Sequence, residues 1–120
     1  MANIFYMLNG LTFREGQKLT ANWGACYPTA EGKIVATDIE GQTKQSLENV
    51  KSILESAGCT MDNVVKTTVL LSDIANFGKM NEVYKGFFSE GNYPARSAFQ
   101  AAALPQGALV EIEVIALKAE

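Results

Sequence analysis

The sequence predicts an α+β fold, in which a single mixed β-sheet of about six strands carries two helices on one face. Two helical segments with apolar faces alternate with strand-like runs, and paired strand-like runs joined by turn residues lie near both ends of the chain. The 120 residues, 48% of them hydrophobic, suffice for one domain (residues 1–120) with a substantial core. A sheet covered on one face leaves its other face to water or to a partner.

The composition argues against several classes of function. A formal net charge of −3 gives no basic footprint for nucleic acid, and no apolar run approaches the ~20 residues of a membrane span. The N-terminus lacks the basic start and long apolar stretch of a signal peptide. Cys26 and Cys59 have neither metal-site spacing nor a disulfide framework, so we expect reduced, unjoined, non-nucleophilic thiols in the cytoplasm. The absence of histidine removes the commonest general base and most zinc sites.

The first quarter of the chain is expected to form short strands. Residues 3–8 are apolar and aromatic, the Asn9-Gly10 pair signals a turn, and residues 11–14 can pair back. A second turn at residues 15–17 precedes a strand over residues 18–27. Pro28 and Gly32 then mark a loop.

The first helix is expected to begin near Thr37 and to end before Gly58. Thr37 and Glu40 have the spacing of a capping box, with Asp38 as the alternative N-cap, and Gly58 stands where a C-terminal glycine cap belongs. One face follows from residues that recur at helical spacing: Ile39, Thr43, Leu47, Val50, Ile53, Leu54 and Ala57.

The second half of the chain is expected to form a strand, a helix and two strands. Residues 63–71 are rich in β-branched side chains, and Asp73 can cap a helix that ends at Gly91 and Pro94. The apolar face of that helix consists of Phe77, Met80, Val83, Tyr84, Phe87 and Phe88. Residues 96–103 and 109–117 are expected to pair as a hairpin through the tight "LPQG" turn.

The last strand has two different faces. One side carries only apolar residues, namely Val110, Ile112, Val114 and Ala116, and the other carries Glu111, Glu113, Ile115 and Leu117. A mixed face of this kind is typical of a subunit interface or a cleft.

Arg96 is a lone charge in an apolar run, and two interpretations are open. It could pair with an acidic side chain at the surface, or it could bind an anion, because a planar guanidinium suits a small carboxylate. Glu111 and Glu113 could likewise form a solvated strand face, or a partly buried glutamate could hold or activate water.

The expected hairpin constrains these residues. A regular hairpin places Arg96 opposite Ala116 and Glu111 opposite Ala101, five residues away and on the other side of the pleat. That separation is roughly 16–17 Å. Arg96 and Glu111 therefore either do not cooperate or meet across a subunit boundary.

Three segments carry a resemblance to a known family: "GKIVATDIEGQTKQSLENVKSILESAG", "NVVKTTVLLSDIANFGKMNEVYKGFF" and "YPARSAFQAAALPQGALVEIEVIAL". Together they resemble the reactive-intermediate deaminases, also called the Rid or YjgF-like family, from Gly32 to the C-terminus. The resemblance implies a chorismate-mutase-like sheet with two helices, assembled as a barrel-like homotrimer with ligand clefts between subunits. It also implies hydrolysis of reactive enamines and imines, such as 2-aminoacrylate, to 2-oxo acids and ammonia without a metal or an organic cofactor.

The resemblance also implies roles for individual residues. Arg96, which follows "PA", is expected to grip the substrate carboxylate, and Glu111, the first glutamate of "EIE", to lie near the attacking water. Trp23, Gly24 and Ala98 are expected to line the cleft.

The chain departs from the family pattern at three cleft positions. Trp23 stands where the family has serine, Ala98 stands where it often has cysteine, and the usual N-terminal tyrosine is missing, with Tyr6 or Tyr27 as alternative sources.

Three functions remain open on this evidence. The first is the deaminase, the second is a noncatalytic trimer that binds small carboxylates or regulates a partner, and the third is an endoribonuclease. An acidic chain without histidine argues against the third.

Overall fold

The computed structural model describes residues 4–6, 11–13, 18–21 and 36–117. Its helices are α1 (Ile39–Ser56) and α2 (Phe77–Tyr84), and its strands are β1 (Ile4–Tyr6), β2 (Leu11–Phe13), β3 (Lys18–Ala21), β4 (Val64–Leu71), β5 (Ala95–Gln100) and β6 (Val110–Leu117). Short 3₁₀ turns at Met61–Asn63, Ile74–Asn76, Lys85–Phe87 and Pro105–Gly107 are labelled η1 to η4. This order of helices and strands is the predicted one. The predicted turns at residues 9–10 and 15–17, and the Pro28–Gly32 loop, lie outside the described residues.

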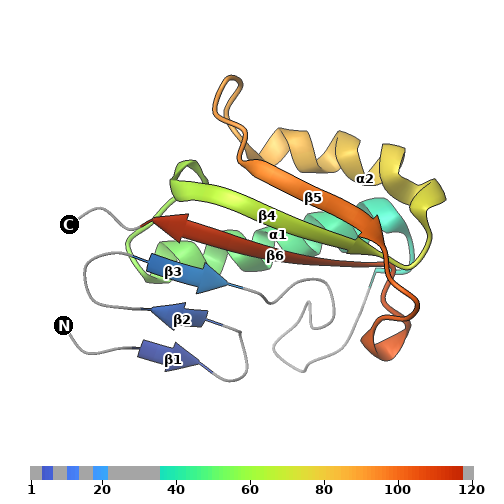
Figure 1. Cartoon of the computed structure of the whole chain (residues 1–120), viewed down its shortest axis with the longest axis horizontal. Coiled ribbons are helices and arrows are strands. Elements are labelled where there is room, and N and C mark those ends of the chain that lie inside the picture. Colours follow the sequence, from blue (N-terminus) through green and yellow to red (C-terminus); the bar gives the residue numbers. More distant parts are fainter. Residues whose placement is uncertain (1–3, 7–10, 14–17, 22–35, 118–120) are drawn as a thin grey trace.

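The strands form one mixed sheet in the order β1-β2-β3-β6-β4-β5, with β4 and β5 parallel and the other neighbours antiparallel. Both helices lie behind the sheet in Figure 1, and buried side chains of both helices join those of β4 and β6 in one core. The predicted α+β class, with two helices on one face of a mixed sheet, is confirmed. No helix within the described ranges is long and apolar enough to span a membrane.

The predicted hairpin between the last two strands is wrong. β4 lies between β5 and β6, so Arg96 is opposite Thr67 rather than Ala116, and Glu111 is opposite Leu70 rather than Ala101. The reason is the helix in the connection: α2 carries the chain back over the sheet, and a crossover of this kind makes β5 parallel to β4. The η4 turn therefore takes the chain past β4 instead of closing a hairpin.

The two ends of α1 follow different parts of the prediction. Asp38 is the N-cap residue, but its side chain makes no capping hydrogen bond, so the predicted box of Thr37 and Glu40 is wrong. At the other end Gly58 has φ 79°, its N–H donates to the Glu55 carbonyl, and the Cys59 N–H donates to the Leu54 carbonyl. These two bonds form a Schellman motif, and the predicted glycine cap is confirmed.

The second strand–helix unit also follows the prediction, with shifted bounds. The predicted strand over residues 63–71 is β4, and Asp73 Oδ1 accepts a hydrogen bond from the Ala75 N–H at 2.9 Å, which caps η2 ahead of α2. Of the predicted apolar face, Met80, Tyr84 and Phe88 are buried and the others are half-buried. Gly91 has φ 80° in the turn that follows.

The last strand buries the side that was predicted to be buried. Val110, Ile112, Val114 and Ala116 are fully buried in the core. A buried valine or isoleucine contributes roughly 1.5–3 kcal/mol, so this one strand contributes several kcal/mol. The other side is mixed, as expected: Glu113 and Leu117 are exposed, whereas Glu111 and Ile115 are half-buried.

A buried glutamine on α1 fixes the start of β6. The Gln42 side chain is 5% exposed; its Oε1 accepts from the Leu109 N–H at 2.8 Å and its Nε2 donates to the Ala36 carbonyl at 3.0 Å. The Leu109 carbonyl in turn accepts from the Ser72 N–H at 3.0 Å. Hydrogen bonds with Gln42 and with Ser72 thus fix the backbone at Leu109, two residues before Glu111.

Candidate functional site

The Arg96 side chain lies on the helix side of β5, against α2. Its Cζ is 4.7 Å from the centre of the Tyr84 ring and 5.1 Å from that of Phe77, and its Nη1 donates to Asn81 Oδ1 at 2.6 Å. Within the described part of the chain, no ion pair joins Arg96 to an acidic side chain. The charge is thus held by two aromatic faces and a neutral amide, which leaves it available to an anion.

A pocket of about 420 Å³ opens beside this guanidinium, lined by Asn81, Tyr84, Lys85, Tyr93, Pro94 and Arg96. Two of the lining side chains are cations and none is an acid. Lys85 pairs with Glu82, Nζ to Oε2, at 2.8 Å, and that hydrogen bond raises the pKa of Lys85. The pocket is therefore suited to a small anion with an apolar or planar body.

The Tyr84 ring packs against the guanidinium of Arg96. Its hydroxyl lies 2.7 Å from Thr67 Oγ1 on β4, and both side chains are buried. Burial raises the pKa of the Tyr84 phenol above its ordinary value, while the Thr67 hydrogen bond and the charge of Arg96 lower it in part. The phenol is neutral at physiological pH, so Tyr84 supports Arg96 through its ring and not through an ion pair.

Asn81 is a site residue that the sequence analysis missed. Phe77, Asn81 and Tyr84 are at positions i, i+4 and i+7 of α2, so their side chains share one stripe of the helix. All three contact Arg96. The available signal was a polar residue inside an otherwise apolar helical stripe, on the helix that precedes the strand of the lone arginine.

Glu111 does not join this pocket within one chain. Arg96 is opposite Thr67, which is opposite Val114, and Val114 is three positions from Glu111 along β6. Two strand spacings and three residues of strand separate the two backbones by ~14 Å. Glu111 also alternates with buried residues, so it lies on the sheet face opposite the helices. The predicted hairpin was wrong, but the corrected register again puts Arg96 and Glu111 on opposite faces.

The other predicted cleft residues fall in two groups. Ala98 on β5 is opposite Val69 of β4 and packs against the core, two positions from Arg96 on the same side of the strand. Trp23 and Gly24 lie outside the described residues, as does Tyr27, and Tyr6 lies in β1.

Neither a metal site nor an accessible thiol accompanies the pocket in the residues described. No group of three histidine, cysteine, aspartate or glutamate side chains in those ranges could hold a metal ion. Cys59, which follows the C-terminal end of α1, is buried in the core, so its thiol is not accessible to ligands. Cys26 lies outside the described residues.

Comparison with known proteins gives matches over most of the chain. The family model for endoribonuclease L-PSP matches residues 22–118. The rat protein named 2-iminobutanoate/2-iminopropanoate deaminase is 52% identical over 89 residues, which cover 74% of this chain and 64% of the rat protein. The human protein of the same name is 48% identical over 89 residues, again 64% of its length. The match therefore spans just under two thirds of these curated relatives.

Solved structures give the same result for the fold. An Entamoeba histolytica protein that bears the endoribonuclease L-PSP name superposes with a TM-score of 0.85 at 40% identity, covering 96% of this chain and 90% of that one. E. coli TdcF, solved with bound serine, superposes with a TM-score of 0.80 at 36% identity, covering 97% and 91%.

Proposed function

The chain belongs to the endoribonuclease L-PSP family, which includes the reactive-intermediate deaminases, and we propose that it hydrolyses reactive 2-imino acids to 2-oxo acids and ammonia. The deaminase names of relatives near 50% identity support the reaction type. The observation that carries the proposal is Arg96: an arginine without an acidic partner in the described part of the chain, beside a small pocket with aromatic walls. A 2-imino acid is a small planar carboxylate and matches that pocket.

Arg96 binds the substrate carboxylate in this proposal. One N–H of the guanidinium donates to Asn81, and among the described residues the other N–H groups have no side-chain acceptor, so they can form a forked pair with a carboxylate. The rings of Phe77 and Tyr84 hold the guanidinium plane in place. Such a charge-assisted pair in a partly dry pocket contributes on the order of 2–4 kcal/mol.

The chemistry needs an activated water and a proton acceptor. The enamine 2-aminoacrylate first takes a proton at carbon to give 2-iminopropanoate, whose protonated nitrogen makes C2 electrophilic. A water held by Glu111 then adds to C2, and the water gives a proton to the Glu111 carboxylate. Glu111 returns this proton to the nitrogen and then takes the proton of the new hydroxyl group, so that the C=O bond forms as the C–N bond breaks. The 2-oxo acid and ammonia leave, and Glu111 gives its proton to water, which balances the proton taken up at carbon. The protonated imine itself polarises the reacting carbon, so this route uses only the chain's own residues and water.

Arg96 and Glu111 come from different subunits in this proposal. We propose a single-domain subunit with a six-stranded sheet that assembles as a barrel-like homotrimer in the cytoplasm. Support comes from the uncovered sheet face, where Phe99 is 50% exposed and Leu117 is 52% exposed. Phe99, Leu70 and Glu111 lie in one row across β5, β4 and β6 on that face. A neighbouring subunit that packs on this apolar row would sit beside Glu111.

A second candidate is a trimer that binds small carboxylates without converting them. It is favoured by the bulky Trp23 and by the missing N-terminal tyrosine at cleft positions. Ammonia release from 2-aminoacrylate generated in situ separates the two functions: the deaminase releases ammonia faster than the uncatalysed reaction, and the binder does not. The family name also raises ribonuclease activity, and a salt-dependent affinity for RNA would support that function instead.

A further inference from the structure

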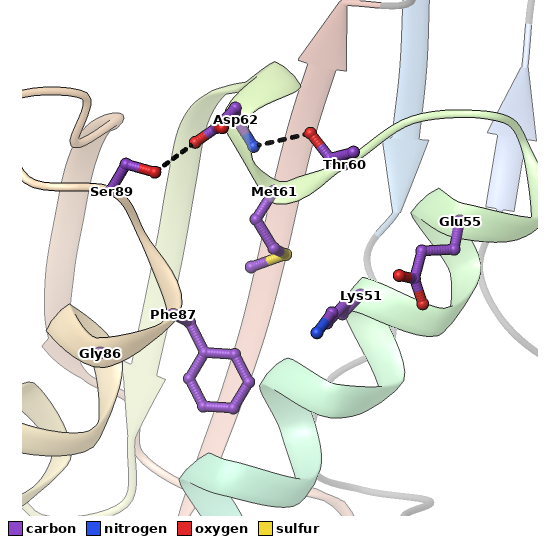
Figure 2. Close-up of a pocket in the computed structure, with 8 residues that line it drawn as sticks. All are labelled: Lys51, Glu55, Thr60, Met61, Asp62, Gly86, Phe87 and Ser89. Atoms are coloured by element: carbon purple, nitrogen blue, oxygen red, sulfur yellow. Dashed lines mark hydrogen bonds between the residues drawn. The ribbon is translucent and has the colours of Figure 1, made fainter.

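A second pocket lies between the C-terminal half of α1 and the segment that follows α2 (Figure 2). Its volume is about 390 Å³, and its lining is Lys51, Glu55, Thr60, Met61, Asp62, Gly86, Phe87 and Ser89. None of these residues lines the Arg96 pocket. We propose that this second pocket binds an α-amino acid with an apolar side chain and that its occupancy alters the Arg96 pocket.

The middle of the pocket is apolar. The Met61 side chain is buried and that of Phe87 is half-buried. Figure 2 shows Met61 extending from the η1 turn and the Phe87 ring extending from η3 toward α1. A flexible thioether beside an aromatic ring accommodates a branched aliphatic side chain well. Apolar surface in the middle of a charged rim favours a ligand with one apolar end and one charged end.

Lys51 supplies the positive charge of the rim. Figure 2 shows its Nζ directed into the pocket, away from the Glu55 carboxylate four residues later. Lys44 and Glu48 have the same spacing on the same helix and do form an ion pair, at 3.9 Å. Within the described residues Lys51 forms no ion pair, so its ammonium group is available to a ligand carboxylate.

Glu55 and Asp62 supply the negative charges. Asp62 Oδ1 accepts from Ser89 Oγ at 2.9 Å and from Asn92 Nδ2 at 3.4 Å, while Oδ2 has no hydrogen-bond partner among the residues described. The lining thus holds one cation and two carboxylates. A net negative rim disfavours a simple carboxylate, whereas an α-amino acid can place its carboxylate at Lys51 and its ammonium group at the acids.

The two pockets have no lining residue in common, but both border the segment from Lys85 to Pro94. In the η3 turn Lys85 lines the Arg96 pocket, whereas Gly86 and Phe87 line the second pocket. Asp62 holds Ser89 and Asn92 in the turn just before Tyr93 and Pro94, which line the Arg96 pocket. A ligand that contacts Phe87 and Asp62 therefore reaches the segment directly at Phe87 and through the hydrogen bonds of Asp62 at Ser89 and Asn92. The proposed change in the Arg96 pocket would affect turnover only through the proposed deaminase function, whereas the binding itself does not rest on that function.

Binding is tested by amide NMR titration of the whole chain with L-leucine, in the absence of any imine substrate. We expect the Gly86, Phe87 and Ser89 amides to move. Lys51→Met should weaken binding about two- to fivefold, because a part-exposed charge pair is worth up to about 1 kcal/mol. Asp62→Asn removes the charge but keeps an acceptor for Ser89, so it should also weaken binding while the fold persists. Lys44→Met, on the same helix but outside the pocket, is the matched control and should leave binding unchanged.

Two analogues and one further variant make the test decisive. Isocaproate lacks the amine and isoamylamine lacks the carboxylate, and both should bind more weakly than leucine. Arg96→Ala should leave leucine binding intact, even though it removes the proposed deaminase activity. The proposal is overturned if the amides of the second pocket do not move. It is equally overturned if either analogue binds as well as leucine, or if binding survives Lys51→Met and is lost in Arg96→Ala.

Discussion

Asn81 tests the geometry of the Arg96 pocket, because the same position can be made neutral and small or negatively charged. Its Oδ1 accepts a hydrogen bond from Arg96 Nη1 at 2.6 Å. Asn81→Ala removes this acceptor and keeps the charge of Arg96. Asn81→Asp keeps the shape but places a full negative charge beside the guanidinium.

The expected magnitudes follow from these contacts. A hydrogen bond to a charged group contributes about 1.5–3 kcal/mol when buried, and Arg96 is exposed, so about 1 kcal/mol is a fair value here. Asn81→Ala should therefore weaken the binding of 2-oxobutyrate about fivefold. Asn81→Asp should weaken it by about tenfold or more, because the new carboxylate occupies the guanidinium and repels the ligand.

Calorimetric titration with 2-oxobutyrate measures both effects, and thermal melting checks that the variants fold. Asn49→Asp is a control that adds the same charge on α1, and it should leave the affinity within about twofold of the parent. If Asn81→Asp bound 2-oxobutyrate as tightly as Asn81→Ala or more tightly, Arg96 would not be the carboxylate-binding group.

Three further predictions concern stability, pH and assembly. Gln42→Leu leaves the part-buried Leu109 N–H and Ala36 carbonyl unpaired and should lower the free energy of unfolding by about 2–4 kcal/mol in urea titration. Gln45→Leu loses the Gln45 Nε2–Asn49 Oδ1 bond of α1 and should lower it by less than about 1 kcal/mol. If both variants lost the same free energy of unfolding, the Gln42 hydrogen bonds would not contribute more than the Gln45 hydrogen bond does. Because burial raises the pKa of Tyr84 in the folded state, the unfolded chain releases the phenol proton at lower pH than the folded chain does. The free energy of unfolding should therefore be constant below pH ~10 and fall above it, and Tyr84→Phe should reduce that fall. An unchanged alkaline slope in Tyr84→Phe would contradict this. Phe99→Glu places a charge in the row of Phe99, Leu70 and Glu111 and should shift the oligomer toward monomer in sedimentation. Ser97→Glu, in the neighbouring row with Thr68 and Glu113, should shift it less. A monomeric parent protein would contradict the proposed assembly.

The sequence predicted the parts of the fold that depend on local patterns. The period of Leu47, Val50 and Leu54 placed α1, and the alternation of Val110, Ile112 and Val114 identified the buried side of β6. Gly58 was recognisable because a helix end needs a residue at positive φ. These features arise within a few neighbouring residues, so a single sequence is enough to find them.

Strand pairing was beyond the sequence pattern. Residues 96–103 and 109–117 look like a hairpin because only a short turn separates them, yet β4 lies between them. Which strand is inserted depends on how α2 packs across the sheet, and that is a property of the whole core. The capping box of Thr37 and Glu40 failed because Asp38, not Thr37, is the N-cap residue, which puts Glu40 at the second helical position instead of the third.

The residues of the candidate site were also predictable from the sequence only in part. Arg96 stood out in the sequence because nothing near it neutralised its charge, and the structure gives it no acidic partner among the described residues. Asn81 did not stand out, because its role depends on the packing of α2 beside β5. The proposed partnership of Arg96 and Glu111 involves a second copy of the chain, and no pattern within one sequence describes an interface.

The most direct test of the shared site is complementation between two inactive variants. Arg96→Ala and Glu111→Gln are each expected to lose the release of ammonia from 2-aminoacrylate. When the two are co-expressed in equal amounts and assemble at random, about one quarter of all interfaces in the trimer population combine an intact Arg96 with the neighbour's intact Glu111. Activity should therefore return to about one quarter of the parent value. Co-expressed trimers that release ammonia no faster than either variant alone would contradict a site built from two subunits.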